Sequence, residues 1–281
     1  IEKNRQNNQK HYKMNTEKLK VHFTDRSLIE PTNPIDVNLI GAGGTGSQVL
    51  TGLARMNHAL TALGHAGLQV RLWDDDVITE ANLGRQLFAE CETGLHKSVA
   101  LINRTNRFFG TNWKAQAEKF QQTESGRTPE NAMATIYISC VDNVAARFEI
   151  ADILRSLSRE RLYRNHPKYW MDFGNSQCTG QVILSTIGNI HQPHSEKYET
   201  IASLPFITDE FGRLLQRSED TDNTPSCSLA EALDKQDLYI NSSLAQMGCS
   251  LLWNMFRNAM TENRGFFFNL DNFISQPLKV A

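Results

Sequence analysis

The sequence predicts an α/β fold: a mostly parallel sheet flanked by helices, with antiparallel strands added in the C-terminal half. Three features lead to this prediction. An apolar run at residues 35–40 passes directly into a glycine-rich turn, apolar segments of strand and helix length alternate up to residue 157, and two apolar runs after residue 168 are joined by a short turn. Alternating strands and helices form parallel sheets with helices on both faces, whereas two strands joined by a short turn pair antiparallel.

The first half of the chain begins with a strand, helix, strand unit. Apolar side chains at positions 35, 37, 39 and 40 predict a buried strand, and the helical spacing of apolar residues from Val49 to Ala54 predicts a helix. Residues 56–67 show a less regular pattern. A second strand, at residues 68–73, ends in three consecutive aspartates.

The later elements follow from the same patterns. They are a helix around residues 99–102, a weak strand at 113–120, a stronger strand at 135–141, a helix at 148–157, strands at 169–173 and 181–187, an amphipathic helix at 244–255 and short strands at 265–274. Residues 190–236 are polar and contain three prolines, so they predict a long loop, which in a compact domain is usually functional or mobile. Residues 1–13 are rich in Asn, Gln and Lys and predict a disordered tail or cloning remnant, which leaves residues 14–281 as a single domain.

The composition is that of an ordinary globular protein and excludes several classes. Of the 281 residues 40% are hydrophobic and 21% charged, and the net charge of −2 gives no basic field to attract nucleic acid. No apolar run approaches the roughly 18 residues needed to span a membrane, and no signal-peptide pattern opens the chain. We therefore expect a cytoplasmic protein with no nucleic-acid or membrane partner.

The glycine-rich turn is the first candidate site. Gly41, Gly43 and Gly46 match the pattern G-x-G-x-x-G between a predicted strand and helix. Glycines let the backbone approach a phosphate, and the helix that follows offers unpaired N–H groups. The same turn also occurs where a strand and a helix merely pack closely, but Asp74, at the end of the second strand, stands where a carboxylate accepts from ribose hydroxyls.

Three further segments favour ATP over a dinucleotide. Residues 76–86 contain Asn82, Arg85 and Gln86, residues 94–98 contain Lys97, and residues 139–147 contain Asp142. A simple dehydrogenase has no need of this group, whereas Arg and Lys neutralise the oxygens of a triphosphate. Asp142 follows a sheet strand, at the edge where a carboxylate can hold Mg²⁺. Taken singly, the first three residues also fit a solvated helix start, and Lys97 fits a surface lysine.

The ordered set of Gly-x-Gly-Gly-x-Gly, Asp…Asn-x-x-Arg-Gln, Lys and Asp-Asn resembles the ThiF/MoeB/HesA family of ubiquitin-activating-type adenylating enzymes, over about residues 35–260. Within that family the chain is most similar to the ThiF-like members of bacterial PRTRC gene systems. The resemblance implies a Rossmann-like fold, binding of Mg²⁺ and ATP, and adenylation of the C-terminal carboxylate of a small ubiquitin-like or sulfur-carrier protein. It also implies a homodimer.

The resemblance assigns roles by position. It places the ATP-binding residues in this sequence at Gly41, Gly43, Gly44, Gly46, Asp74, Asn82, Arg85, Gln86 and Lys97. The glycines would line the phosphates, and Asp74 would hold the ribose. Asp142 would hold the metal and, with Arg85 and Lys97, would contribute to catalysis.

Some members of the family transfer the acyl group to a cysteine. Cys227 stands in the long loop ahead of the late amphipathic helix, where a helix N-terminus would favour its thiolate; an unreactive loop cysteine is the alternative. Cys140 and Cys249 fall in a strand and a helix and are expected in the core, and Cys178 is a weaker candidate nucleophile. The pair His191 and His194, in a polar loop, is expected to be solvated.

Two departures from the family qualify the resemblance. Many members hold structural zinc with two C-x-x-C pairs, and this chain has neither, so we expect no zinc. Many also carry an N-terminal arginine that reaches the partner's ATP, for which Arg26 is the only equivalent. Two other functions are possible for this fold. The first is a non-catalytic subunit that binds a ubiquitin-like protein as a scaffold, but such a subunit would have no reason to keep Arg85, Lys97 and Asp142. The second is a nicotinamide-dependent oxidoreductase, but the sequence lacks the catalytic His or Tyr-x-x-x-Lys pattern of those enzymes.

Overall fold

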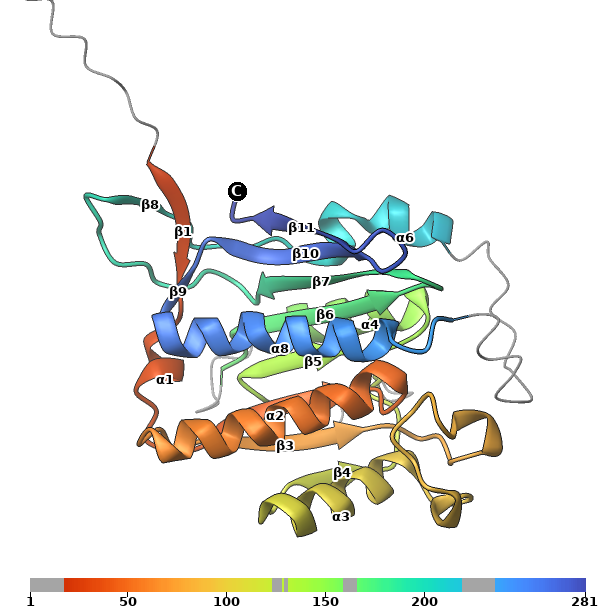
Figure 1. Ribbon diagram of the computed structural model, residues 1–281. Helices are drawn as coiled ribbons and strands as arrows, with labels where there is room; N and C mark the ends of the chain where they lie inside the picture. The colour runs from red at the N-terminus through yellow and green to blue at the C-terminus, as the bar shows by residue number, and fades with distance from the viewer. Residues whose placement is uncertain (1–17, 123–127, 129–130, 159–165, 219–235) are drawn as a thin grey trace, which may run out of the picture.

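The structure, a computed structural model, describes residues 18–122, 128, 131–158, 166–218 and 236–281. Its centre is an eight-stranded sheet with the order β11-β10-β7-β6-β5-β2-β3-β4 (Figure 1). The strands are β2 (Ile35–Ile40), β3 (Leu68–Trp73), β4 (Lys114–Gln116), β5 (Ile136–Ser139), β6 (Tyr169–Asn175), β7 (Thr179–Thr186), β10 (Asn263–Asn269) and β11 (Ile274–Lys279).

The sheet is parallel in one half and antiparallel in the other. Strands β4, β3, β2, β5 and β6 run parallel, and the register aligns their carboxyl ends, with Ile40 opposite both Trp73 and Ser139. Strands β7, β10 and β11 continue the sheet antiparallel. This arrangement confirms the predicted fold class, and it brings the ends of five parallel strands to one edge, where α/β sheets bind ligands.

Helices cover both faces of the sheet. On one face lie α2 (Gly44–Ala62), α3 (Lys97–Phe109) and α8 (Ile240–Asn258), and on the other lie α4 (Val144–Leu157), α5 (Ile207–Glu210) and α6 (Gly212–Ser218) (Figure 1). Each face encloses its own apolar core. Burial on both faces explains why the central strands are apolar throughout rather than alternating.

The prediction of an irregular segment at residues 56–67 is wrong over most of its length, because α2 continues to Ala62. Met56 and Leu60 are buried and continue the apolar face set by Leu53. Residues three and four apart share one side of a helix, so the spacing does support a helix here. The helix ends at Leu63, and Gly64 then takes a positive φ of 84°.

The expected loop at residues 190–236 is partly ordered into elements, which corrects the prediction for the described portion. It contains β8 (Tyr198–Thr200), α5 and α6; residues 219–235 lie outside the described part of the chain. The sequence also gave no indication of β1 (Leu19–Phe23), of α1 (Arg26–Ile29) or of the small sheet β8-β1-β9, in which β9 is Met260–Thr261. Strands of two to five residues are too short to establish a periodic pattern.

Strand β1 is anchored by a buried histidine. The His22 ring lies 2.7 Å from the carbonyl oxygen of Ile201 and 2.9 Å from the hydroxyl of Tyr169. Desolvation by burial lowers the pKa of His22, although the Ile201 carbonyl opposes that shift. Through its contact with Tyr169 of β6, the His22 ring links β1 to the main sheet.

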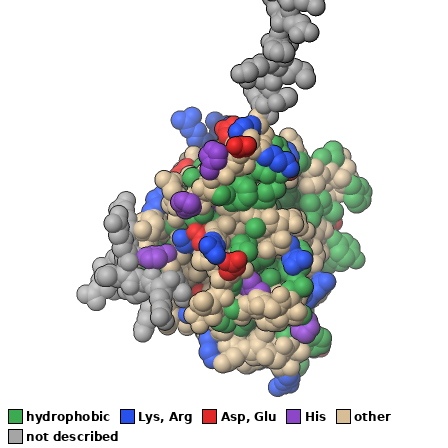
Figure 2. Space-filling view, turned by 90° about the vertical axis from the view of Figure 1, so that its left-hand side faces the viewer, with side chains coloured by type: hydrophobic (Ala, Val, Ile, Leu, Met, Phe, Trp, Pro, Cys, Tyr) green, Lys and Arg blue, Asp and Glu red, His purple; other side chains and the backbone are tan. Residues whose placement is uncertain are grey.

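No helix in the described ranges is long and apolar enough to cross a membrane. Figure 2 shows the end of the molecule where α1 and β8 lie. On that face Lys and Arg side chains are interspersed with acidic and histidine side chains.

Candidate functional site

The glycine turn connects β2 to α2, and its glycines have different reasons to be glycine. Gly41 has a φ of +96°, and a Cβ there would lie 2.6 Å from the carbonyl oxygen of Cys140. At Gly46 a Cβ would lie 1.9 Å from the Gly41 oxygen, so this glycine allows the helix to pack on the turn. A Cβ at Gly43 would meet nothing within 4 Å. Among the four glycines of the turn, only Gly43 therefore has free space beside it, into which a bound phosphate could fit.

A cavity of about 480 Å³ opens at this edge of the sheet, and its size falls within the range of roughly 300–1,000 Å³ for small-molecule sites. Eight of the predicted site residues line it: Gly41, Gly43, Gly44, Asp74, Arg85, Gln86, Lys97 and Asp142. They come from the ends of β2, β3 and β5 and from the segment between β3 and α3. The structure thus brings together residues that are up to about a hundred positions apart.

Asp74 ties the end of β3 to the glycine turn. Its Oδ2 accepts a hydrogen bond from the backbone N–H of Ala42 at 2.6 Å, and its Oδ1 accepts from the N–H of Asp76 at 3.0 Å. Desolvation by burial raises the pKa of Asp74, and the Ala42 N–H and the Lys97 charge oppose that rise. A carboxylate has about four acceptor positions, so Asp74 can fix the turn and still accept from a ribose.

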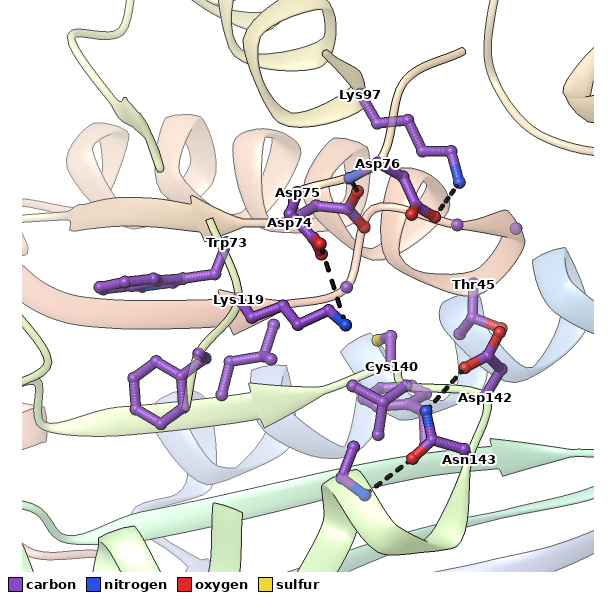
Figure 3. Close-up of a pocket in the computed structure, with 18 of the residues that line it drawn as sticks. Thr45, Trp73, Asp74, Asp75, Asp76, Lys97, Lys119, Cys140, Asp142 and Asn143 are labelled. Atoms are coloured by element: carbon purple, nitrogen blue, oxygen red, sulfur yellow. Dashed lines mark hydrogen bonds and ion pairs between the residues drawn. The ribbon is translucent and has the colours of Figure 1, made fainter. Parts of the chain in front are cut away.

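The two predicted cations are both held by partners. The buried Lys97 Nζ lies 2.7 Å from Asp76 Oδ2 (Figure 3), and Arg85 donates from Nη1 to Gln236 Oε1 at 2.7 Å. Desolvation lowers the pKa of Arg85, and the nearby Asp142 opposes this. Among the described residues, five buried side-chain polar atoms have no hydrogen-bond partner, and two of them, Arg85 Nε and Gln86 Oε1, belong to residues that line the cavity. Buried polar atoms are rarely left so, which fits a site that a polar ligand completes.

Asp142 stands between β5 and α4, where the backbone is held from two sides. Asn143 begins α4 by accepting from the Ala146 N–H at 2.7 Å, and it donates to Asp142 at 3.3 Å (Figure 3). Arg147 is buried, lies 3.1 Å from Asp172, and donates to the carbonyl of Val141 at 2.8 Å. This contact fixes the peptide that precedes Asp142.

The residues fit a magnesium ion only if a ligand shares it. In the described part of the chain no group of three or more His, Cys, Asp or Glu side chains is suited to hold a metal. Mg²⁺ usually takes one or two carboxylates together with substrate phosphates and water. Asp142 supplies one carboxylate, and Arg85, Lys97 and the glycine turn are suited to hold the phosphates that would supply further oxygen ligands.

On the β4 side, apolar side chains form part of the cavity wall. Trp73 and Phe120 are buried, with ring centroids 5.1 Å apart, and Ile150 of α4 also lines the cavity. Lys119 lies beside Trp73 (Figure 3), and its Nζ is 3.9 Å from Asp75 Oδ2. Such walls suit a planar base. The sequence analysis did not identify Phe120, Lys119 or Ile150 as site residues. Their only signal was their position just beyond β4 or within the helix after Asp142.

The opposite side of the cavity is lined by amides that sequence reasoning missed entirely. Asn241, in the first turn of α8, accepts from Thr45 at 2.8 Å and from Asn175 at 2.9 Å, and donates to Gln236 at 2.8 Å. Gln236 in turn accepts from Arg85. All five residues line the cavity.

Several predicted site residues do not line the cavity. The Asn82 side chain accepts from the Thr79 N–H at 2.9 Å and so caps a short 3₁₀ helix, Glu80–Asn82. Gly46 acts through backbone packing. Cys227 lies outside the described residues. Arg26 belongs to α1, at the other end of the sheet, where its exposed guanidinium lies 2.9 Å from Glu30.

Of the other four cysteines, Cys91 is exposed and lies outside the cavity lining, and the remaining three have raised pKa values. Burial raises the pKa of Cys249 to about 12 and raises that of Cys140 well above its usual value, although Cys140 lines the cavity. A hydrogen bond to Asp271 raises the pKa of Cys178. Because the thiolate is the nucleophile, all three are weak candidates.

The glycine turn, the aligned strand ends and the cavity define an α/β protein of the Rossmann type. A family model described as the ThiF family matches residues 18–280, and the chain belongs to that family. No curated protein sequence matches this one.

Solved structures share the fold. The structure of Escherichia coli MccB with ATP matches at a TM-score of 0.55 and 15% identity, covering 90% of this chain and 65% of MccB. MccB with selenomethionine MccA matches at 0.54 and 16%, covering 91% and 66%, and selenomethionine PaaA at 0.54 and 14%, covering 88% and 64%. The chain thus spans just under two thirds of the length of these proteins.

Proposed function

We propose that the chain binds ATP with Mg²⁺ and adenylates the C-terminal carboxylate of a peptide or small protein. The observation that carries this proposal is the gathering of Arg85, Gln86, Lys97 and Asp142 around one cavity, with buried polar atoms of Arg85 and Gln86 left without partners in the described structure. Membership of the ThiF family supports it. So does the likeness to MccB, which has been solved with ATP and with MccA.

The residues suit a reaction in which charge has to be neutralised. An oxygen of the substrate carboxylate forms a bond to the α-phosphorus of ATP, and the bond from that phosphorus to the bridging oxygen breaks, so that pyrophosphate leaves with the electron pair. No proton is transferred in this step. Its main requirements are positioning and stabilisation of the phosphate charge, which Arg85 and Lys97 would supply from the cavity wall.

Asp142 would hold the metal, and Mg²⁺ when bound neutralises phosphate oxygens and orients the leaving group. Trp73, Phe120 and Ile150 would enclose the base, and Asp74 would accept from the ribose. Because Lys97 pairs with Asp76, we expect it to exchange that carboxylate for a phosphate oxygen when ATP binds.

The direct test is exchange of labelled pyrophosphate into ATP in the presence of a candidate substrate with a free C-terminal carboxylate. We expect exchange by the wild-type chain and its loss in Asp142→Ala. ATP binding without exchange, for every candidate encoded beside this chain, would favour the scaffold function. Equal exchange in the variant would remove Asp142 from the mechanism.

We further propose that the substrate is a small ubiquitin-like or sulfur-carrier protein, that the enzyme acts as a homodimer, and that Cys227 receives the acyl group after adenylation. The family resemblance, including that to PRTRC-associated members, supports this finer assignment. We expect Cys227→Ala to retain pyrophosphate exchange but to lose a reductant-sensitive covalent conjugate with the carrier, as detected by mass spectrometry. A conjugate that persists in the variant would contradict the role of Cys227.

A further inference from the structure

We propose that Asn175, Gln236 and Asn241 form a subsite that binds the last peptide unit of the substrate, next to the carboxylate that is activated. This inference rests on the proposed function and deepens it. It names the residues that would distinguish the end of a peptide or protein chain from a free carboxylic acid or amino acid.

The position of these residues along the sheet edge is the first argument. The apolar walls at Trp73 and Phe120 belong to the β3–β4 side of the cavity, and the glycine turn follows β2 in the middle. Asn175 ends β6, which lies beyond β5 on the other side of β2. With a base beside β3 and phosphates at the turn, the cavity beside β6 is left for the group that reacts with the phosphate.

The second argument is the polarity of the amide chain, which Arg85 determines. A guanidinium can only donate, so Gln236 must present its oxygen to Arg85 and must accept again from the Asn241 nitrogen. The Asn241 oxygen then faces Asn175, which must donate to it. The oxygen and nitrogen atoms of a side-chain amide can usually be told apart only by inference from its hydrogen bonds. Here the contact with Arg85 determines the orientation of all three amides.

This polarity leaves a defined pair of groups. In the described part of the chain, no hydrogen bond engages the Gln236 Nε2 or the Asn175 Oδ1, and both residues are half-buried in the cavity wall. One is a donor and the other an acceptor. A peptide unit offers a carbonyl oxygen and an N–H, and so complements both, whereas a free α-ammonium group offers only donors.

The subsite is also rigid. Asn241 is buried, and its amide lies so close to α2 that a Cβ at Gly44 would come within 2.6 Å of it. Thr45, in the first turn of α2, donates to the same amide. The acyl subsite is thus built against the helix that follows the phosphate turn, which would hold the carboxylate in a fixed position relative to the α-phosphate.

The test uses binding rather than turnover. Three stable adenylate analogues are compared by isothermal titration calorimetry: 5′-O-sulfamoyladenosine, its N-propionyl derivative and its N-(acetylglycyl) derivative, of which only the last carries a peptide unit. In the wild-type chain we expect the acetylglycyl derivative to bind about tenfold more tightly than the propionyl one, as two hydrogen bonds of ordinary strength allow.

The variants are Asn175→Ala and Gln236→Ala, with Asn33→Ala as the matched control because Asn33 is exposed in the turn before β2, at the other end of the sheet. We expect the tenfold preference to fall to less than twofold in the first two and to persist in the control. Thermal melts establish that each variant is folded, and Asn175→Ser provides a second, smaller change at the same position.

The outcomes separate the two proposals. If the wild-type chain binds sulfamoyladenosine but shows no preference for the peptide unit, or if folded variants retain the preference, the subsite is wrong and the proposed function stands. If the wild-type chain binds neither sulfamoyladenosine nor ATP, the proposed function fails, and the subsite fails with it.

Discussion

The two ends of the cavity are built in different ways. The nucleotide end consists of backbone turns and side chains at the ends of adjacent strands: Asp74 directly follows β3, and Asp142 lies three residues after the end of β5. The far end consists of amides from β6 and from the start of α8, joined to Arg85 through Gln236. The first end depends on glycine and on charge, and the second on the polarity of a hydrogen-bond chain.

This difference indicates how the two ends can change independently. A strand end and its turn are fixed by sheet register, so a substitution there alters the backbone on which a nucleotide rests. The amide chain is fixed by side-chain orientation, so a substitution there alters which substrate fits while the turn is preserved. Arg85 belongs to both ends and is the point at which they meet.

The largest effect is expected at the nucleotide end, from Asp142→Ala. Loss of a carboxylate that holds the metal should lower the rate of pyrophosphate exchange by about 10²–10³-fold, or ~3–4 kcal/mol in the barrier. Affinity for adenosine monophosphate should change little, because that ligand needs no metal-bridged phosphates. Exchange at more than a third of the wild-type rate would contradict this role.

The glycine turn gives the next effect, and it has an internal control. Gly46→Ala would push a Cβ against the Gly41 oxygen, and overpacking of this kind costs about 1–3 kcal/mol of stability, measurable by urea denaturation. Gly43→Ala meets no protein atom and should leave stability nearly unchanged while weakening ATP binding. Equal losses of stability in the two variants would show that the turn is not organised as described.

A third prediction concerns pH. Burial raises the pKa of Asp74, and Lys97 opposes that rise, so Lys97→Met should raise it further. If ATP binding needs the carboxylate, acidification should weaken binding from a higher pH in the variant than in the wild type, in addition to a loss of roughly tenfold at neutral pH from the missing cation.

Calorimetric titration with ATP between pH 5 and 8 measures this shift. Lys114→Met, which removes an exposed cation from β4, is the control. In this variant ATP binding should weaken at the same acidic pH as in the wild type. If ATP affinity falls at the same acidic pH in Lys97→Met and in the wild type, Asp74 does not take part in binding.

The smallest effect is expected far from both ends. Arg26→Ala removes an exposed pair with Glu30, which is worth about 0.3–0.5 kcal/mol in a helix, and should not alter ATP affinity of the isolated chain. A loss of pyrophosphate exchange that depends on protein concentration would instead reveal that Arg26 acts across a dimer.

The sequence predicts the nucleotide end of the cavity much better than the amide end. Gly41, Asp74, Lys97 and Asp142 stand at the ends of strands and the starts of helices, and apolar periodicity locates those boundaries. Asn175 and Asn241 carry no such signal. Their roles arise only once β6 and α8 are packed beside α2, and an isolated Asn in a sequence is far more often a turn or surface residue.

The errors in the fold have related causes. The extent of α2 differs from the prediction although Met56 and Leu60 continue its apolar face, because the intervening residues, such as the exposed His58, are mostly polar or small and obscure the pattern. The small sheet formed by β1, β8 and β9 was missed because its strands pair across the whole chain and bury few residues each. The ligand-binding role of Asn82 stays a prediction; in the structure its side chain accepts from the Thr79 N–H and caps the turn that contains it, which is a common use of Asn.

The anchoring of β1 has a consequence for how the chain is made. His22 contacts Ile201 across 179 positions, and β1 also pairs with β9, at residues 260–261. During synthesis, which proceeds at about 5–20 residues per second, β1 has no partners until most of the chain has been translated. Long-range pairing slows folding, so β1 docks among the last elements, and an N-terminal segment translated early is ordered late.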